Sequence, residues 1–183
     1  MEKLYVFVFM SLLMSQPTKA PTVIAVDLPI HKHPPIEVVI EQENVSDFMK
    51  AIAFKESRGI HDTVNKYGML GKYQFSRATL NGLGYDNISD TVFLQSEALQ
   101  DEVMKELIKH NYKILHRQIT KYNGCLIDSI CVTESGILAA AHLAGPSNVK
   151  KWLRSNGKKT RTDGFGTSIE TYMNKFANYK INI

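Results

Sequence analysis

From residue 46 onward the sequence is a series of amphipathic helical segments, and most of them end at a glycine. In the first segment, Phe48, Met49, Ile52 and Ala53 recur at the spacing of one helix face, and Gly59 follows them. Alternating patterns typical of strands are nearly absent, so the sequence predicts a mostly α-helical fold. The later segments stop at Gly84, Gly124, Gly145 and Gly157.

The expected helix starts carry residues that can cap free backbone N–H groups. Ser46, Ser96, Thr133 and Ser147 stand at such starts, and residues 167–170 (TSIE) form a capping box that opens the last helix. The segment after Thr133 is rich in alanine, which permits close packing, so we expect it at the centre of the domain. The expected helices cover about 46–58, 75–83, 96–123, 133–144, 147–156 and 167–176.

Residues 1–20 predict a signal peptide. Lys3 precedes an apolar run of 11 residues at positions 4–14. This run is shorter than the roughly 20 residues that span a bilayer. Cleavage after Ala20 would place Pro21 at the new N-terminus, so the sequence does not determine the cleavage site. The alternatives to a signal peptide are an uncleaved N-terminal tether and a buried first helix. We expect an exported bacterial protein of the periplasm or cell envelope that is not inserted in the membrane after processing.

A proline-rich linker is expected between the signal peptide and a single domain. Residues 21–44 hold four prolines, and the domain is expected over 45–183. The chain is 44% hydrophobic and 22% charged, which is typical of a globular protein. Its net charge of +4 suits a polyanionic polymer such as cell wall or nucleic acid. Six basic residues lie within 150–161, but Trp152 is the one aromatic among them, so a solvated basic face is favoured over nucleic-acid binding.

The two cysteines exclude a disulfide-stapled scaffold or a four-thiolate zinc site. In an oxidising compartment Cys125 and Cys131 could close a short loop, and two free thiols in a core are the alternative. A hydrolase that pairs either cysteine with His142 is disfavoured, because no neighbour lowers the thiol pKa. No His, Cys and Asp residues have the spacing of metal ligands, so we expect neither a metal nor a cofactor.

Glu56 is the carboxylate that the first helix places on its apolar face. It lies four residues after Ile52 and eight after Phe48, so helix geometry brings the three side chains together. Burial and the negative end of the helix dipole both disfavour the charged form, so we expect a raised pKa for Glu56. A carboxylic acid that stays protonated near neutral pH can protonate the departing oxygen of a glycosidic bond. The alternative is a Glu56 side chain that turns into solvent or pairs with Lys55 or Arg58.

Four motifs together resemble the soluble lytic transglycosylase (SLT) domain family, which has the goose-type-lysozyme-like fold. In that family a Glu-Ser pair closes a helix and a Gly-x-x-Gly-x-x-Gln loop crosses the cleft beneath it; this chain has Glu56-Ser57 and GMLGKYQF at 68–75. The segment AHLAG at 141–145 stands where the family has Ala-Tyr-Asn-Ala-Gly. The segment ETYM at 170–173 is similar to its closing Glu-Thr and Tyr motif. His-Leu in place of Tyr-Asn is the clearest departure.

The resemblance implies a single helical domain with a cleft and Glu56 as the one catalytic acid/base. Such an enzyme protonates the oxygen between N-acetylmuramic acid and N-acetylglucosamine. It then takes a proton from the muramyl 6-hydroxyl, which closes a 1,6-anhydro ring without water. The nucleophile belongs to the substrate, so no second carboxylate is required.

The same resemblance implies further residues beside the acid or the sugar. Ser57 would hydrogen-bond near the acid or the sugar, or only to the helix-end backbone. Gln74 would hold an acetamido group or pack the loop, and Tyr73 would stack on sugar. Tyr172 would point at Glu56 or lie in the core as a plain tyrosine. The expected substrate-binding residues are Ser57, Gly71, Tyr73, Gln74, His142 and Tyr172.

Two rival functions use the same fold. A hydrolytic lysozyme would need a second carboxylate, for which Asp62 and Asp163 are candidates. A non-catalytic protein would bind the cell wall without releasing sugars. In each case the expected partners are peptidoglycan glycan strands, bound by a monomer, with no nucleic acid. The sequence leaves three biological roles open: wall remodelling, a part in a secretion or conjugation machine, and a phage enzyme.

Overall fold

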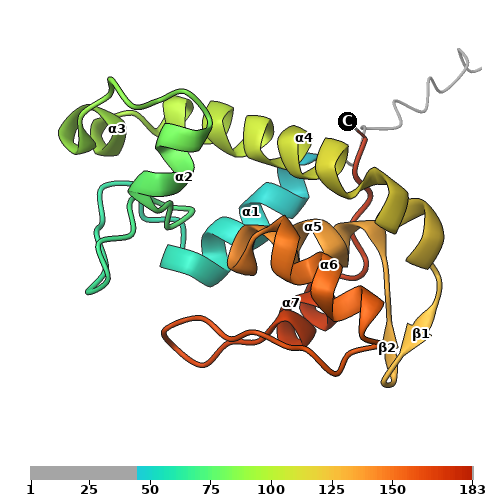
Figure 1. The fold of residues 1–183 in the computed structure, drawn as a ribbon. Helices are drawn as coiled ribbons and strands as arrows, with labels where there is room; N and C mark the ends of the chain where they lie inside the picture. Colours follow the sequence, from blue (N-terminus) through green and yellow to red (C-terminus); the bar gives the residue numbers. More distant parts are fainter. Residues whose placement is uncertain (1–44, 183) are drawn as a thin grey trace, which may run out of the picture. The chain divides into compact units, whose positions relative to one another are not determined.

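The computed structural model describes residues 45–182, so the predicted signal peptide (1–20) and the predicted linker (21–44) both lie outside the described residues. The described residues form seven helices and one short hairpin, which confirms the mostly α-helical prediction (Figure 1). The elements are α1 (Val45–Ser57), α2 (Arg77–Gly82), α3 (Asp90–Gln95), α4 (Glu97–Tyr122), β1 (Leu126–Ile127), β2 (Ile130–Cys131), α5 (Glu134–Ala144), α6 (Pro146–Arg154) and α7 (Ile169–Lys175).

Helix α5 lies at the centre of this arrangement, as its alanine-rich sequence predicts. Its residues from Ser135 to Ala141 are all buried, and it packs against α4, α6 and α7. The approach to α7 is very close at Gly136, where an added Cβ would lie 2.8 Å from the carbonyl oxygen of Met173. The small residues of α5 therefore set the distance between α5 and α7.

Helix α4 is the longest helix, and one of its faces is buried. Val103, Leu107, Leu115 and Ile119 lie on that face, and most of the exposed residues of the helix are charged. None of the helices within 45–182 combines the length and the hydropathy that a membrane span requires.

Serine and threonine side chains fix the starts of most helices. In each case the side-chain oxygen accepts a hydrogen bond from the backbone N–H three residues later, which satisfies one of the free donors of the first turn. The capping residues of α2, α3, α4, α5 and α7 are Ser76, Ser89, Ser96, Thr133 and Ser168.

Several predicted details of the helix starts are wrong. Ser46 lies inside α1. Ser147 is the second residue of α6, because Gly145 (φ 79°) and Pro146 begin that helix. Helix α3 was not expected, since a six-residue helix carries too little periodicity to be recognised.

The predicted capping box at the start of α7 is also different. Ser168 is the cap in place of Thr167, and the Glu170 carboxylate also binds side chains outside the helix. It accepts hydrogen bonds from Trp152 Nε1 at 2.6 Å and from Thr160 Oγ1 at 2.6 Å. The indole of Trp152 is fully buried, and a buried N–H needs an acceptor, which decides the position of Glu170.

The two cysteines are free, as in the second of the two alternatives, but they are exposed, so their place in a core is wrong. Cys125 directly precedes β1, and Cys131 is the second residue of β2, where it pairs with Leu126. Cys125 is one position before Leu126 and therefore faces the opposite side of the ribbon from Cys131.

Candidate functional site

A cavity of about 590 Å³ opens between the end of α1, the loop that follows it, and the C-terminal end of α5. Three of the predicted site residues line it. These are Glu56, Gln74 and His142. The remaining wall comes from α2, from the middle of α4, and from the loop at 163–165 that precedes α7.

Glu56 is the last but one residue of α1 and is largely shielded from water, with 18% of its side chain exposed. Ile52 and Phe48, one and two helical turns before it, are fully buried, as the helical spacing predicts. The hydroxyl of Tyr172 on α7 donates a hydrogen bond to Glu56 Oε1. Burial, together with the charge of Glu56, raises the pKa of Tyr172 far above its usual value, so Tyr172 stays a donor.

His142 flanks Glu56 from the end of α5. Its Nε2 lies 3.9 Å from Glu56 Oε1, and 7% of its side chain is exposed. Burial lowers the pKa of His142, although the charge of Glu56 and a backbone contact with Tyr73 oppose the shift. The ring meets Phe75 edge to face at 6.0 Å, and Nδ1 has no hydrogen-bond partner in the described part of the chain. A neutral imidazole therefore stands beside the carboxylate.

Gln74 belongs to the loop that crosses the cavity. It adopts a positive φ of 54°, and its side-chain Nε2 donates to Gly71 O at 2.8 Å. Its half-buried side chain therefore lies along its own loop while it lines the cavity.

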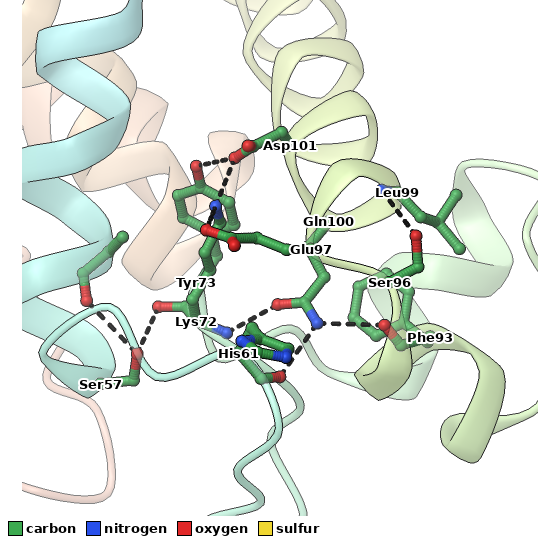
Figure 2. A network of polar contacts seen from close by, with 11 residues as sticks. Ser57, His61, Lys72, Tyr73, Phe93, Ser96, Glu97, Leu99, Gln100 and Asp101 are labelled. Atoms are coloured by element: carbon green, nitrogen blue, oxygen red, sulfur yellow. Dashed lines mark hydrogen bonds and ion pairs between the residues drawn. The ribbon is translucent and has the colours of Figure 1, made fainter.

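The loop is held from behind by Gln100 of α4, which is fully buried (Figure 2). Gln100 Oε1 accepts from Lys72 N at 2.8 Å, and its Nε2 donates to His61 O at 2.9 Å and to Phe93 O at 3.0 Å. Gly71 (φ 72°) passes so close that an added Cβ would lie 2.3 Å from Gln100 Oε1. Only glycine fits this position, on grounds of both conformation and space.

Lys72 adds a second connection between the loop and α4 (Figure 2). Its Nζ pairs with Glu97 at 2.8 Å and with Asp101 at 2.9 Å. Burial by itself lowers the pKa of Lys72, but the bonds and charges of the two carboxylates outweigh it and raise the pKa. The hydroxyl of Tyr73 donates to Asp101 at 2.5 Å, and Ser57 Oγ donates to Lys72 O at 2.9 Å.

Ser57, Gly71 and Tyr73 do not line the cavity. Each instead contacts the loop or α4, and the ring of Tyr73 is 2% exposed. The direct sugar contacts expected of these three residues gain no support from where they lie. Their contacts stabilise the loop that carries Gln74.

The two carboxylates proposed for a hydrolytic mechanism are placed differently. Asp62 does not line the cavity, whereas Asp163 does. Asp163 Oδ1 accepts from the backbone N–H of Phe165 at 2.8 Å and of Thr167 at 2.7 Å, so it shapes its own loop. Within residues 45–182 no three His, Cys, Asp or Glu side chains are grouped so that they could hold a metal ion.

Two exposed rings in the cavity wall were not singled out from the sequence. Tyr67 and Phe165 line the cavity from the two loops that face each other across it. Each ring follows an Asn or Asp by two residues, at Asn65 and Asp163. Such a residue can form a turn with the backbone that follows it, and this was the one available signal.

A model of the transglycosylase SLT domain matches residues 36–164, which is more than half of the chain. The chain belongs to the SLT transglycosylase family. The family's members are lytic transglycosylases that act on peptidoglycan, so this SLT domain indicates a peptidoglycan-degrading enzyme of that type and confirms the resemblance found in the motifs. The match includes Glu56, the loop and the end of α5, and it stops before α7. Comparisons with curated proteins and with solved structures give no match.

Proposed function

We propose that this SLT enzyme cleaves the β-1,4 bond between N-acetylmuramic acid and N-acetylglucosamine, with Glu56 as its single general acid/base and a 1,6-anhydro sugar as product. The observation that carries the proposal is the position of Glu56. It is a shielded carboxylate in the wall of a cavity of about 590 Å³, hydrogen-bonded by Tyr172 and flanked by His142.

In the first step protonated Glu56 gives its proton to the bridging oxygen, and the bond from that oxygen to C1 of the muramyl unit breaks. In the second step the Glu56 carboxylate accepts the proton of the muramyl 6-hydroxyl while that oxygen bonds to C1. The proton count on Glu56 is then restored, and neither water nor a second carboxylate is consumed.

Tyr172 and His142 support this role without reacting themselves. The Tyr172 hydroxyl occupies Oε1 of Glu56, which fixes the rotation of the carboxyl group and leaves Oε2 for proton transfer. Burial lowers the pKa of His142, which favours the neutral imidazole beside Glu56.

The rival functions receive less support from the same geometry. Asp163 Oδ1 accepts hydrogen bonds from the backbone of its own loop, which gives it a structural role, and Asp62 lies outside the cavity wall. A Cys-His hydrolase is disfavoured because neither cysteine lines the cavity that His142 lines.

The decisive experiment compares Glu56→Gln with the wild type on purified peptidoglycan. We expect muropeptide release to fall by at least about a hundredfold, because the proton donor is lost, while the melting temperature stays nearly unchanged. Glu102→Gln, at an exposed carboxylate of α4, is the matched control. Undiminished release by Glu56→Gln would remove this residue from the mechanism.

Mass spectrometry of the wild-type products separates the two reaction types. An anhydro product is lighter by one water than the product of hydrolysis. Products of the heavier mass would show a hydrolase, and binding without release would show a wall-binding protein.

We further propose that residues 1–20 are a signal peptide, that residues 21–44 are a linker, and that the enzyme acts in the periplasm or cell envelope. The apolar run at positions 4–14 and the wall substrate of the family support this. Sequencing the N-terminus of the protein recovered from the envelope tests it, and an intact Met1 would contradict cleavage.

A further inference from the structure

We propose that Tyr67 and Phe165, with the ammonium group of Lys66, form a binding platform for a muramyl unit at the mouth of the cavity. The apolar C–H face of the sugar stacks on the rings, and a carboxylate of its peptide stem pairs with Lys66. The inference rests on the proposed function, since it names how the glycan strand is held beyond the bond that is cut.

The two rings are joined across the cavity although they lie 98 residues apart (165 − 67). The Tyr67 hydroxyl donates to Gly164 O at 2.7 Å. The rings meet edge to face, with centroids 4.9 Å apart and planes at 79°. At Gly164 an added Cβ would lie 2.8 Å from the Tyr67 ring, so only glycine allows this contact.

Both rings are held by the same kind of turn. Asn65 Oδ1 accepts from the N–H of Tyr67 at 2.8 Å and of Met69 at 3.1 Å. Asp163 Oδ1 accepts from the N–H of Phe165 and of Thr167 in the same two-residue and four-residue spacing. The rings are therefore positioned before any ligand arrives, which lowers the entropic cost of binding.

The platform leaves apolar surface open to the cavity. Tyr67 is 47% exposed and Phe165 is 59% exposed, and both line the cavity that contains Glu56. Exposed aromatic surface in a cleft is typical of a ligand site, because a bound ligand removes it from water. A sugar ring, with one apolar face and a polar rim, matches this surface.

Lys66 gives the platform its charge preference. Its Nζ lies 5.0 Å from the Tyr67 centroid and 5.2 Å from the Phe165 centroid, which places the ammonium over both rings. The described residues contain no ion pair of Lys66, so its charge is available to a carboxylate from outside. Muramyl units carry such groups on their peptide stems, whereas N-acetylglucosamine units carry none.

The test measures binding by the Glu56→Gln protein, so that it does not depend on turnover. Two ligands are titrated calorimetrically: a muramyl tetrasaccharide with peptide stems and an uncharged N-acetylglucosamine tetramer. We expect Phe165→Ala to weaken the binding of both ligands about fivefold to tenfold, because ring stacking is lost. Lys66→Gln should weaken only the stem-bearing ligand, and the effect should shrink at high salt.

Phe54→Ala is the matched control, since Phe54 is 64% exposed on α1 and does not line the cavity. Equal affinities for Phe165→Ala and Phe54→Ala would overturn the platform, even if the enzyme releases anhydro products normally. If Lys66→Gln lost equal affinity for the two ligands, the proposed carboxylate contact would be overturned. Weakened binding by Phe165→Ala, together with a wild-type protein that releases no anhydro product, would instead retain the platform and reject the proposed reaction.

Discussion

The two walls of the cavity are stabilised in different ways. The α1 wall (residues 56–75) is held from behind by buried polar side chains, above all Gln100 and Lys72, that connect it to α4. The α5–α7 wall (residues 141–172) is held by turns within its own loop and by the Glu170 carboxylate on Trp152. The first wall carries the family's Glu-Ser and loop motifs, and the second departs from the family at His142 and the following leucine. The first wall therefore depends on buried polar contacts to α4, whereas the loop of the second wall depends on hydrogen bonds within itself.

Among the variants that test this comparison, Gln100→Leu should lower the free energy of unfolding most. It leaves the N–H of Lys72 and the carbonyls of His61 and Phe93 without their buried partner, and we expect a loss of roughly 4 kcal/mol in the free energy of unfolding. Urea denaturation measures it. Gln118→Leu, at a half-buried glutamine of the same helix, should change stability by less than about 1 kcal/mol. Similar losses in the two variants would mean that Gln100 does not hold the α1 wall.

Glu170→Ala tests the other wall, and we expect a smaller loss in the free energy of unfolding, about 2 kcal/mol. The variant removes the acceptor of one buried donor, Trp152 Nε1, and of the exposed Thr160 hydroxyl. Glu170→Gln keeps an acceptor oxygen and should cost less still. Both variants can be followed by the same denaturation experiment. A loss for Glu170→Ala as large as that for Gln100→Leu would remove the distinction between the walls.

The smallest effect should be a pH dependence from His142. Burial lowers its pKa in the folded protein below the ordinary value of 6.5, so the unfolded chain binds the proton more readily. Neutral His142 therefore makes its full contribution to the free energy of unfolding above the pKa that it has in the unfolded chain. This contribution is lost as the pH falls through 6.5 and below. Unfolding free energies at about pH 7.5 and about pH 5.5 should differ more for the wild type than for His142→Gln. An identical difference in both proteins would show that His142 does not titrate with folding.

Local features of the sequence predicted the first helix and the position of Glu56 on it. The spacing of Phe48, Ile52 and Glu56 is a property of one helix, and the structure places them on one face as expected. Gln100 had no such signal, because a glutamine within a helical stripe looks like any polar residue until its partners 28 and 39 residues away are known.

The aromatic residues of the site show where prediction from the sequence fails. Tyr73 was expected to meet sugar, but the turn at Gly71 directs it to Asp101 and into the interior. Tyr67 and Phe165 are the exposed rings instead, and their contact joins two loops that no local pattern relates. Which side of a loop a ring occupies depends on backbone angles and on distant neighbours, so periodicity does not predict it.

The close approach of α5 and α7 at Gly136 sets how accurately Tyr172 meets Glu56. Met173 touches the place where a side chain at position 136 would begin, and Tyr172 is its neighbour in sequence. Even one methyl group at 136 would push the α7 backbone outward and carry the phenol away from the acid. The alignment of two groups 116 residues apart thus depends on a residue that has no side chain and touches neither of them.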